Sequence, residues 1–174
     1  MIAGDYLEEI QFQIMKRIIF YALLCCARKS FSQDKQKLIQ IDSMVIAINK
    51  SDLRSQNDSI FKNYPELGMD MKTYLTTILA GNELKKFVNK VHITMQENGA
   101  SVQSLSSNTF YFDKSQLIKV EEFMIKNGKE MHADWYYADD KPLYYTLESD
   151  KSEERATLLL TMSKAMLKQI REKL

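Results

Sequence analysis

The 174-residue chain contains few of the residue types that mark specialised classes of protein. Its only cysteines are the neighbours Cys25 and Cys26, so the rest of the chain has no disulfide framework. Five glycines and two prolines exclude collagen-like and low-complexity chains. A net charge of +1 removes the general electrostatic argument for binding nucleic acid, because phosphate binding needs surplus Lys and Arg. With 45% hydrophobic residues the chain is expected to fold, and its length suits one domain.

The N-terminal region has the layout of a secretory signal peptide over residues 15–32. A basic pair precedes a ten-residue apolar run, Ile18 to Ala27, and small residues then mark a cleavage point at Ser32. A membrane-spanning helix needs about twenty apolar residues, which is longer than this run. The sequence therefore predicts cleavage near Ser32, a periplasmic or secreted protein, and no stable membrane span.

The residues before this signal are acidic, which is unusual for the start of a signal peptide. Residues 1–14 carry three acidic side chains, so translation is expected to start at Met15, with an over-called start before it. One alternative is a single helix over residues 6–27 of a cytosolic protein. Another is a lipid anchor at Cys25 or Cys26, although neither cysteine follows the usual small residue.

Residues 33–174 are expected to form one mature α+β domain. Apolar residues at three- and four-residue spacing predict an amphipathic helix over residues 35–50. The stretch Asp52 to Tyr64 is predicted to be a loop, because it is polar and is followed by Pro65 and Gly68. A second apolar stripe predicts a C-terminal helix over residues 153–173.

One pattern occurs three times within residues 72–148: an apolar or aromatic strand, a short polar turn, and a strand that opens with Leu. The three copies begin at Thr73, Asn108 and Asp134. Polar turns this short favour β-hairpins. The expected fold is therefore α+β, an antiparallel meander of about six strands in three repeated hairpins. It is packed by an N-terminal and a C-terminal amphipathic helix.

Two of these hairpins carry a resemblance to a known group of proteins. Tyr-Phe-Asp-x-x-x-Leu-Ile-Lys-Val at 111–120 and Trp-Tyr-Tyr-x-x-x-x-x-Leu at 135–143 resemble small exported, Bacteroidetes-like bacterial proteins. Those proteins repeat a Tyr-Phe-Asp-x-Gly-x-Leu β-hairpin and are mostly uncharacterised. The turns at 114–116 and 139–142 lack the glycine of that pattern. The resemblance implies no catalytic residue, so none is carried over.

Asn49-Lys-x-Asp52 looks like the guanine-reading motif of GTPases. A nucleotide site of that kind also needs a glycine-rich loop whose backbone amides hold the phosphates. No two of the five glycines have the spacing of such a loop. The apolar run before Asn49 also fits the predicted helix, so the motif is interpreted as the polar end of that helix.

The ionisable residues of the domain do not combine into a catalytic or metal-binding set. Two histidines without a cysteine are too few for a zinc site, and the acidic cluster lacks calcium-loop spacing. The paired carboxylates are expected on opposite sheet faces, where they cannot act together. The histidines are His92, which is expected to be exposed, and His132. The paired carboxylates are Glu121 and Glu122, and the acidic cluster is Asp134, Asp139 and Asp140. We predict no enzyme activity, no catalytic, cofactor-binding or metal-binding residue, and no cofactor.

Aromatic residues are concentrated in one part of the chain, with nine of 18 between Phe110 and Tyr145. Strand alternation places Trp135 and Met131 on one face and Tyr136 on the other. Trp135 is predicted to lie in the core, under the helices. Tyr136 and Tyr144 are the candidate partner contacts, on a face expected to stay open.

These observations favour an exported, non-enzymatic binding or interaction module with an unknown ligand. The alternative is a periplasmic inhibitor or immunity-type protein that blocks a partner enzyme. The expected partner is a protein, a peptide or a glycan, and not nucleic acid. The sequence leaves the ligand and the oligomeric state open.

Overall fold

The computed structural model describes residues 34–174, with gaps at 98–99, 127, 148, 150 and 173–174. The predicted signal peptide, its cleavage at Ser32, the start at Met15 and the lipid anchor at Cys25 or Cys26 lie outside the described residues. A helix over residues 34–50 begins the described part, and residues 41–174 belong to one structural unit. Among the described residues, no helix has both the length and the apolar character needed to cross a membrane.

Seven antiparallel strands follow this helix in a meander, each paired with its neighbours in sequence. They are β1 (Arg54–Tyr64), β2 (Met69–Ala80), β3 (Glu83–Glu97), β4 (Ala100–Asp113), β5 (Gln116–Lys126), β6 (Lys129–Ala138) and β7 (Lys141–Tyr145). A short 3-10 helix, η1 (Pro65–Leu67), joins β1 to β2, and helix α2 (Ser152–Arg171) follows β7. The predicted α+β meander with a helix at each end of the domain is confirmed, with seven strands in place of about six.

Strand β1 is the extra strand, and the predicted loop over Asp52 to Tyr64 is wrong. β1 pairs with β2 along its whole length, from Arg54 opposite Leu79 to Tyr64 opposite Met69. Ten of its eleven residues are exposed, and none is buried. A half-buried strand shows apolar residues at every second position, but a strand exposed on both faces has no need of that pattern. Its polar sequence therefore reads as a loop.

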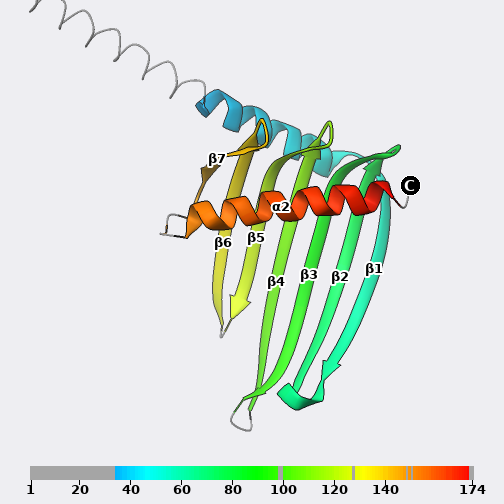
Figure 1. Cartoon of the computed structure of the whole chain (residues 1–174), viewed down its shortest axis with the longest axis vertical. Coiled ribbons are helices and arrows are strands. Elements are labelled where there is room, and N and C mark those ends of the chain that lie inside the picture. The colour runs from blue at the N-terminus through cyan, green and yellow to red at the C-terminus, as the bar shows by residue number, and fades with distance from the viewer. Residues whose placement is uncertain (1–33, 98–99, 127, 148, 150, 173–174) are drawn as a thin grey trace, which may run out of the picture. The chain divides into compact units, whose positions relative to one another are not determined.

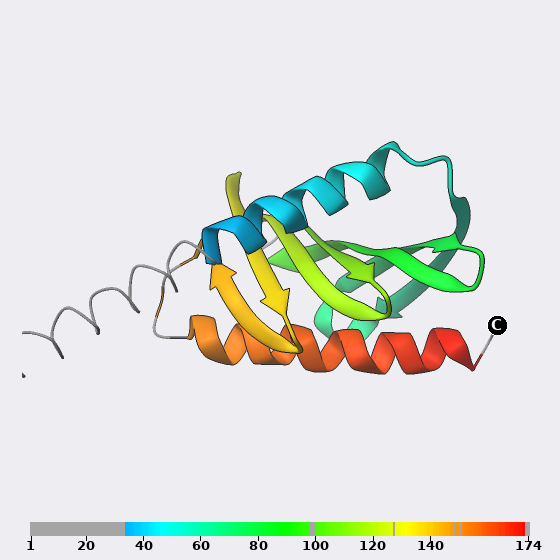
Figure 2. The same cartoon turned by 90° about the horizontal axis from the view of Figure 1, so that it is seen from above.

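The two helices lie on opposite faces of the sheet, as Figures 1 and 2 show for residues 41–50 and for α2. The expectation that both helices share one face and leave the other open is therefore wrong. The physical reason lies in three consecutive aromatic residues of β4. Phe110, Tyr111 and Phe112 are 0%, 2% and 0% exposed, so both faces of the sheet need a cover at this point.

The main core lies between α2 and the sheet. Apolar side chains of five strands, β2 to β6, meet one face of the helix there, as the stripe of apolar residues in the sequence predicts. The largest fully buried side chains include Trp135, Tyr137, Phe110 and Phe112 on the sheet and Leu159 on α2. On the opposite face, Ile41 and Val45 of the first helix are buried at 6% and 5% exposure.

The helices do not cover the whole sheet. In Figure 1, α2 crosses the strands near one end, and β2, β3 and β4 continue well past it. Apolar side chains in these strands are mostly half-buried, and Tyr74 of β2 is 46% exposed. Ile60 and Phe61 of the neighbouring strand β1 are 43% and 58% exposed. The sheet thus has a helix-covered end and an uncovered end.

Two of the hairpin turns bend without glycine. Lys114 and Ser115 have φ angles of 48° and 63°, and Asp139 and Asp140 have φ angles of 53° and 59°. Positive φ at both central residues is the geometry of a type I′ turn, whose twist matches that of the flanking strands. The predicted hairpins at these two places are confirmed. Their turn residues adopt a positive φ that is strained for side chains other than glycine, and a glycine there would relieve this strain.

Candidate functional site

A cavity of 780 Å³ lies on the α2 face of the sheet, beside the first turn of α2. Strands β4, β5 and β6 form its floor, and α2 with part of the segment before it forms the opposite wall. We call it the Trp135 pocket. Its lining includes Ser106, Asn108, Glu122, Met124, Met131, Ala133, Trp135, Leu147, Ser152 and Arg155.

The register of the sheet brings the floor of the Trp135 pocket together from three strands. Asn108 of β4 lies opposite Glu122 of β5, and Glu122 lies opposite Ala133 of β6. Ser106, Met124 and Met131 make the next row in the same way. Because alternate residues of a strand share a face, both rows point to the side that α2 occupies.

Trp135 is the only tryptophan of the chain, and it is 1% exposed. Its prediction as a core residue is confirmed, whereas Met131, expected on the same covered face, is 51% exposed. The indole packs against Tyr145 with a ring-centroid distance of 5.5 Å. Its Nε1 has no hydrogen-bond acceptor among the described residues. A buried donor without an acceptor costs about 1–3 kcal/mol, so this group favours any ligand that supplies one.

The wall of the pocket is held by polar contacts of Glu122, Ser152 and Arg155. The Arg155 guanidinium donates to both carboxylate oxygens of Glu122, and this hydrogen bonding raises the pKa of Arg155. The Ser152 hydroxyl donates to the Leu147 carbonyl oxygen at 2.6 Å. The same hydroxyl accepts from the Ser149 amide at 2.9 Å. These groups fix the wall and are already engaged, whereas the ionisable side chains of Glu130, His132 and Lys151 also line the pocket.

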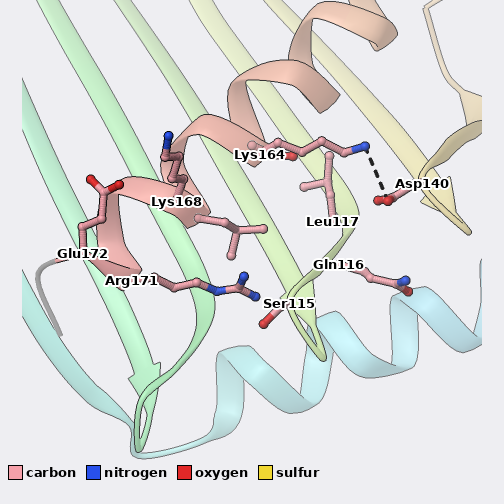
Figure 3. Close-up of a pocket in the computed structure, with 10 residues that line it drawn as sticks. Ser115, Gln116, Leu117, Asp140, Lys164, Lys168, Arg171 and Glu172 are labelled. Carbon is pink, nitrogen blue, oxygen red and sulfur yellow. Dashed lines mark ion pairs between the residues drawn. The ribbon is translucent and has the colours of Figure 1, made fainter.

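A second cavity, of 530 Å³, runs along the C-terminal half of α2 (Figure 3). Its basic side chains are Lys164, Lys168 and Arg171, and the Lys164 ammonium lies 3.4 Å from an Asp140 carboxylate oxygen. Both members of that ion pair are about half exposed. Among the described residues, the buried side-chain atoms without a partner are Asn89 Oδ1 and Trp135 Nε1, and neither lines this cavity. The Trp135 pocket is therefore the better candidate for a ligand.

Lys119 organises the other face of the covered end. Its ammonium lies 3.2 Å from Asp42, 3.3 Å from Glu121 and 3.2 Å from Asp134, and its side chain is 7% exposed. Burial alone would lower the pKa of Lys119, but the Tyr136 hydroxyl and the surrounding carboxylates raise it well above its usual value. The ammonium is therefore held charged, and it ties β5 and β6 to residue 42 of the first helix.

The two tyrosines predicted to contact a partner have different environments. Tyr136 is only 7% exposed, because its hydroxyl donates to Asp42 at 3.0 Å and its ring lies under the Lys119 ammonium. The expectation that Tyr136 is exposed is therefore wrong. Tyr144 is 46% exposed and packs beside Tyr136 with ring centroids 5.9 Å apart. A role of either tyrosine in partner binding stays a prediction.

The other residues singled out in the sequence have structural surroundings. Asn49 lies in the first helix, where its amide donates to the Tyr111 hydroxyl at 3.3 Å, so its interpretation as a helix end is confirmed. Glu121 and Glu122 point to opposite faces, and His92 is exposed, both as predicted. Within residues 34–174, outside the gaps, no group of three or more His, Cys, Asp or Glu is placed to hold a metal.

No local pattern in the sequence indicates the Trp135 pocket. Its floor residues Ser106, Asn108 and Met124 are ordinary strand residues, and only the register of three strands brings them together. The one available signal was the single tryptophan, a residue that needs a hydrogen-bond partner when it is buried. Comparisons of the chain with protein-family models, curated proteins and solved structures found no match.

Proposed function

We propose that the protein is an exported, non-enzymatic binding module that holds a small amphipathic ligand in the Trp135 pocket. The observation that carries this proposal is that Trp135, whose buried Nε1 has no acceptor among the described residues, lines a 780 Å³ cavity. Ligand sites commonly have volumes of roughly 300–1,000 Å³ and a few polar groups in an apolar lining. The ligand would place an apolar body against Met124 and Ala133 and an acceptor atom on the indole.

Binding without a reaction is supported by the engagement of two polar groups of the pocket, Glu122 and Ser152. Acid–base catalysis needs a group that can give or take a proton close to the ligand. The Glu122 carboxylate is paired with Arg155, and the Ser152 hydroxyl donates to a backbone carbonyl. The described residues that line the pocket include no serine hydroxyl hydrogen-bonded to a histidine.

Export is supported by the signal-like residues 15–32 and by a mature chain that has no cysteine. The proposed location is the periplasm or the cell exterior. Expressed from Met15 in a Gram-negative host, the protein should accumulate in the periplasm and begin at Gln33. N-terminal sequencing checks this, and an intact Met15 in the cytoplasm would contradict it.

Ligand binding is tested with anilinonaphthalene sulfonate, a probe with apolar rings and an anionic acceptor group. Trp135 is the only tryptophan, so energy transfer from its indole reports probe bound close to it. Ser106→Phe fills the pocket from β4, and Ser107→Phe, on the other face of the same strand, is the matched control.

We expect Ser106→Phe to raise the dissociation constant of the probe, measured by energy transfer from Trp135, by about tenfold or more. The loss of one well-packed subsite has an effect of this size. Ser107→Phe should leave the affinity unchanged. Thermal melts of both variants confirm that the fold is retained. Equal probe affinity of Ser106→Phe and the parent protein would refute the pocket.

The alternative function, a periplasmic inhibitor or immunity-type protein, is favoured by a different observation. Ile60, Phe61 and Tyr74 are exposed on strands of the uncovered end, where a partner enzyme could dock. In that case the protein should inhibit a lytic activity of a periplasmic extract, and Phe61→Ser with Tyr74→Ser should remove the inhibition. Probe binding in the Trp135 pocket would be unaffected by these changes.

A further inference from the structure

The two edges of the sheet differ in how well they can pair with another strand. At one edge, β7 has five residues and contains Pro142, which has no backbone N–H to donate. At the other edge, β1 has eleven residues and no proline, and no strand of the described residues pairs with its outer side. A long edge strand presents unpaired backbone donors and acceptors that can bind one more strand.

The orientation of the β1 backbone can be assigned from one hydrogen bond. The Ser59 N–H donates to its neighbour Asp58 at 2.7 Å, so it points away from the β2 ladder. In an antiparallel strand, alternate residues direct both backbone groups to the same side. Asn57, Ser59, Phe61 and Asn63 therefore present their N–H and C=O groups along the outer edge.

We propose that two copies of this chain pair through β1, antiparallel to each other, with a two-fold axis at Ile60. In this register Ser59 of one copy exchanges backbone hydrogen bonds with Phe61 of the second copy, and its N–H leaves the Asp58 carboxylate to which it donates in the single chain. Ile60, which is 43% exposed in one chain, meets Ile60 of the second copy. The two sheets become continuous across the axis.

Charge complementarity selects this register. Asp58 lies opposite Lys62 of the second copy, and the two-fold axis repeats this pair, so two opposite-charge pairs flank the central Ile60 pair. An axis at Asp58 would instead oppose Asp58 to itself and Arg54 to Lys62, and like charges directly opposite are destabilising. An axis at Gln56 would pair Arg54 with Asp58 but would align fewer than half of the residues of β1.

Charged residues on an edge strand can also serve to prevent pairing. The spacing of Asp58 and Lys62 distinguishes the two roles. Asp58 and Lys62 carry opposite charges and lie two residues before and two residues after Ile60. Antiparallel pairing about Ile60 therefore places each of them opposite the other in the second copy. When two identical edges pair about Ile60, Asp58 and Lys62 of each copy therefore face opposite charges. Charges that serve to prevent pairing would instead face like charges and repel the second copy.

The test is a charge exchange on the purified protein, followed by sedimentation analysis over a range of concentrations. Asp58→Lys alone and Lys62→Asp alone each place like charges opposite each other twice. We expect each to raise the dimer dissociation constant by about tenfold or more. Asp58→Lys combined with Lys62→Asp restores both pairs and should return the dissociation constant to within about threefold of the parent value.

Glu154→Lys, the same charge change at an exposed position of α2, is the matched control and should leave the dimer unchanged. Thermal melts confirm that each variant is folded. A parent protein that stays monomeric up to about millimolar concentration overturns the proposal. A dimer that Asp58→Lys does not weaken, or that the double variant does not restore, overturns it equally.

Discussion

Strands β6 and β1 belong to the same sheet and differ in length by one residue, yet their environments have little in common. Ala133, Trp135, Tyr136 and Tyr137 of β6 are all buried, whereas no residue of β1 is buried. The difference lies in what covers the faces. The C-terminal part of β6 lies between α2 and the first helix, while neither helix buries a side chain of β1 within the described residues.

The two regions therefore use the same backbone pairing for different purposes. At the covered end, large aromatic side chains on both faces supply the burial that stabilises the fold. At the uncovered end, backbone hydrogen bonds continue the sheet with little burial, so its side chains and its outer edge remain available for contacts. Because the side chains of β1 are exposed, its sequence shows no strand pattern. The same exposure leaves its outer edge available to pair with another strand.

The largest expected effect separates the stability of the two regions. Trp135→Ala removes a fully buried aromatic side chain and should lower the free energy of unfolding by about 3–5 kcal/mol. Tyr74→Ala, at a 46% exposed site of the uncovered end, should cost less than about 1 kcal/mol. Urea unfolding of the two variants measures both values. A larger loss for Tyr74→Ala would reverse the assignment of the two regions.

A second prediction concerns the polar packing of the covered end. Lys119→Met keeps the buried stem but leaves Asp42, Glu121 and Asp134 without their cation. We expect a loss of about 1–3 kcal/mol at neutral pH, below that of a fully buried broken pair, because the carboxylates reach solvent. The matched control is Lys72→Met on exposed β2, which should change the urea midpoint little. Equal losses for the two variants would contradict the account.

A third prediction follows from the alkaline titration of the same region. Burial raises the pKa of Tyr111 to about 12, and the pKa of Lys119 is also raised. The folded state then keeps protons that the unfolded chain releases above pH about 10. Stability should fall from pH about 10 to about 12, by at most about 1.4 kcal/mol per pH unit for each group.

Tyr111→Phe removes one of several groups whose pKa is raised in the folded state, among them Tyr136 and Tyr137 as well as Lys119, so the loss of stability at alkaline pH should become less steep. Urea unfolding monitored by circular dichroism at several alkaline pH values measures this slope. An unchanged slope in Tyr111→Phe would show that Tyr111 does not keep its proton in the folded state.

The smallest expected effect lies in the turns. Ser115→Gly should raise the free energy of unfolding by about 0.5–1 kcal/mol, because Ser115 has a φ of 63° that glycine adopts without strain. Gly81→Ala is the reciprocal change, at a φ of 61° with open space around it, and should destabilise by a similar amount. A gain in thermal stability for Gly81→Ala would contradict the turn geometry.

The sequence predicted the parts of this fold that depend on local patterns. The stripe of apolar residues located α2, and the alternation around Trp135 placed that side chain in the core. Alternation misled where burial is two-sided, as at Tyr136, whose hydroxyl binds Asp42 far away in the chain. Alternation of apolar and polar residues gave no signal where no residue is buried, as along β1. The Trp135 pocket depends on the register of three strands, which no local pattern encodes.

Amide hydrogen exchange, resolved by strand, tests the contrast between the two regions most directly. In dilute, monomeric protein, the amides of Phe110, Val120 and Trp135 should exchange only when the whole domain unfolds. Those of β1 should exchange far faster, through local opening, and should slow as the concentration rises and β1 pairs with a second copy. Protection of β1 equal to that of β6 in the monomer would contradict the account.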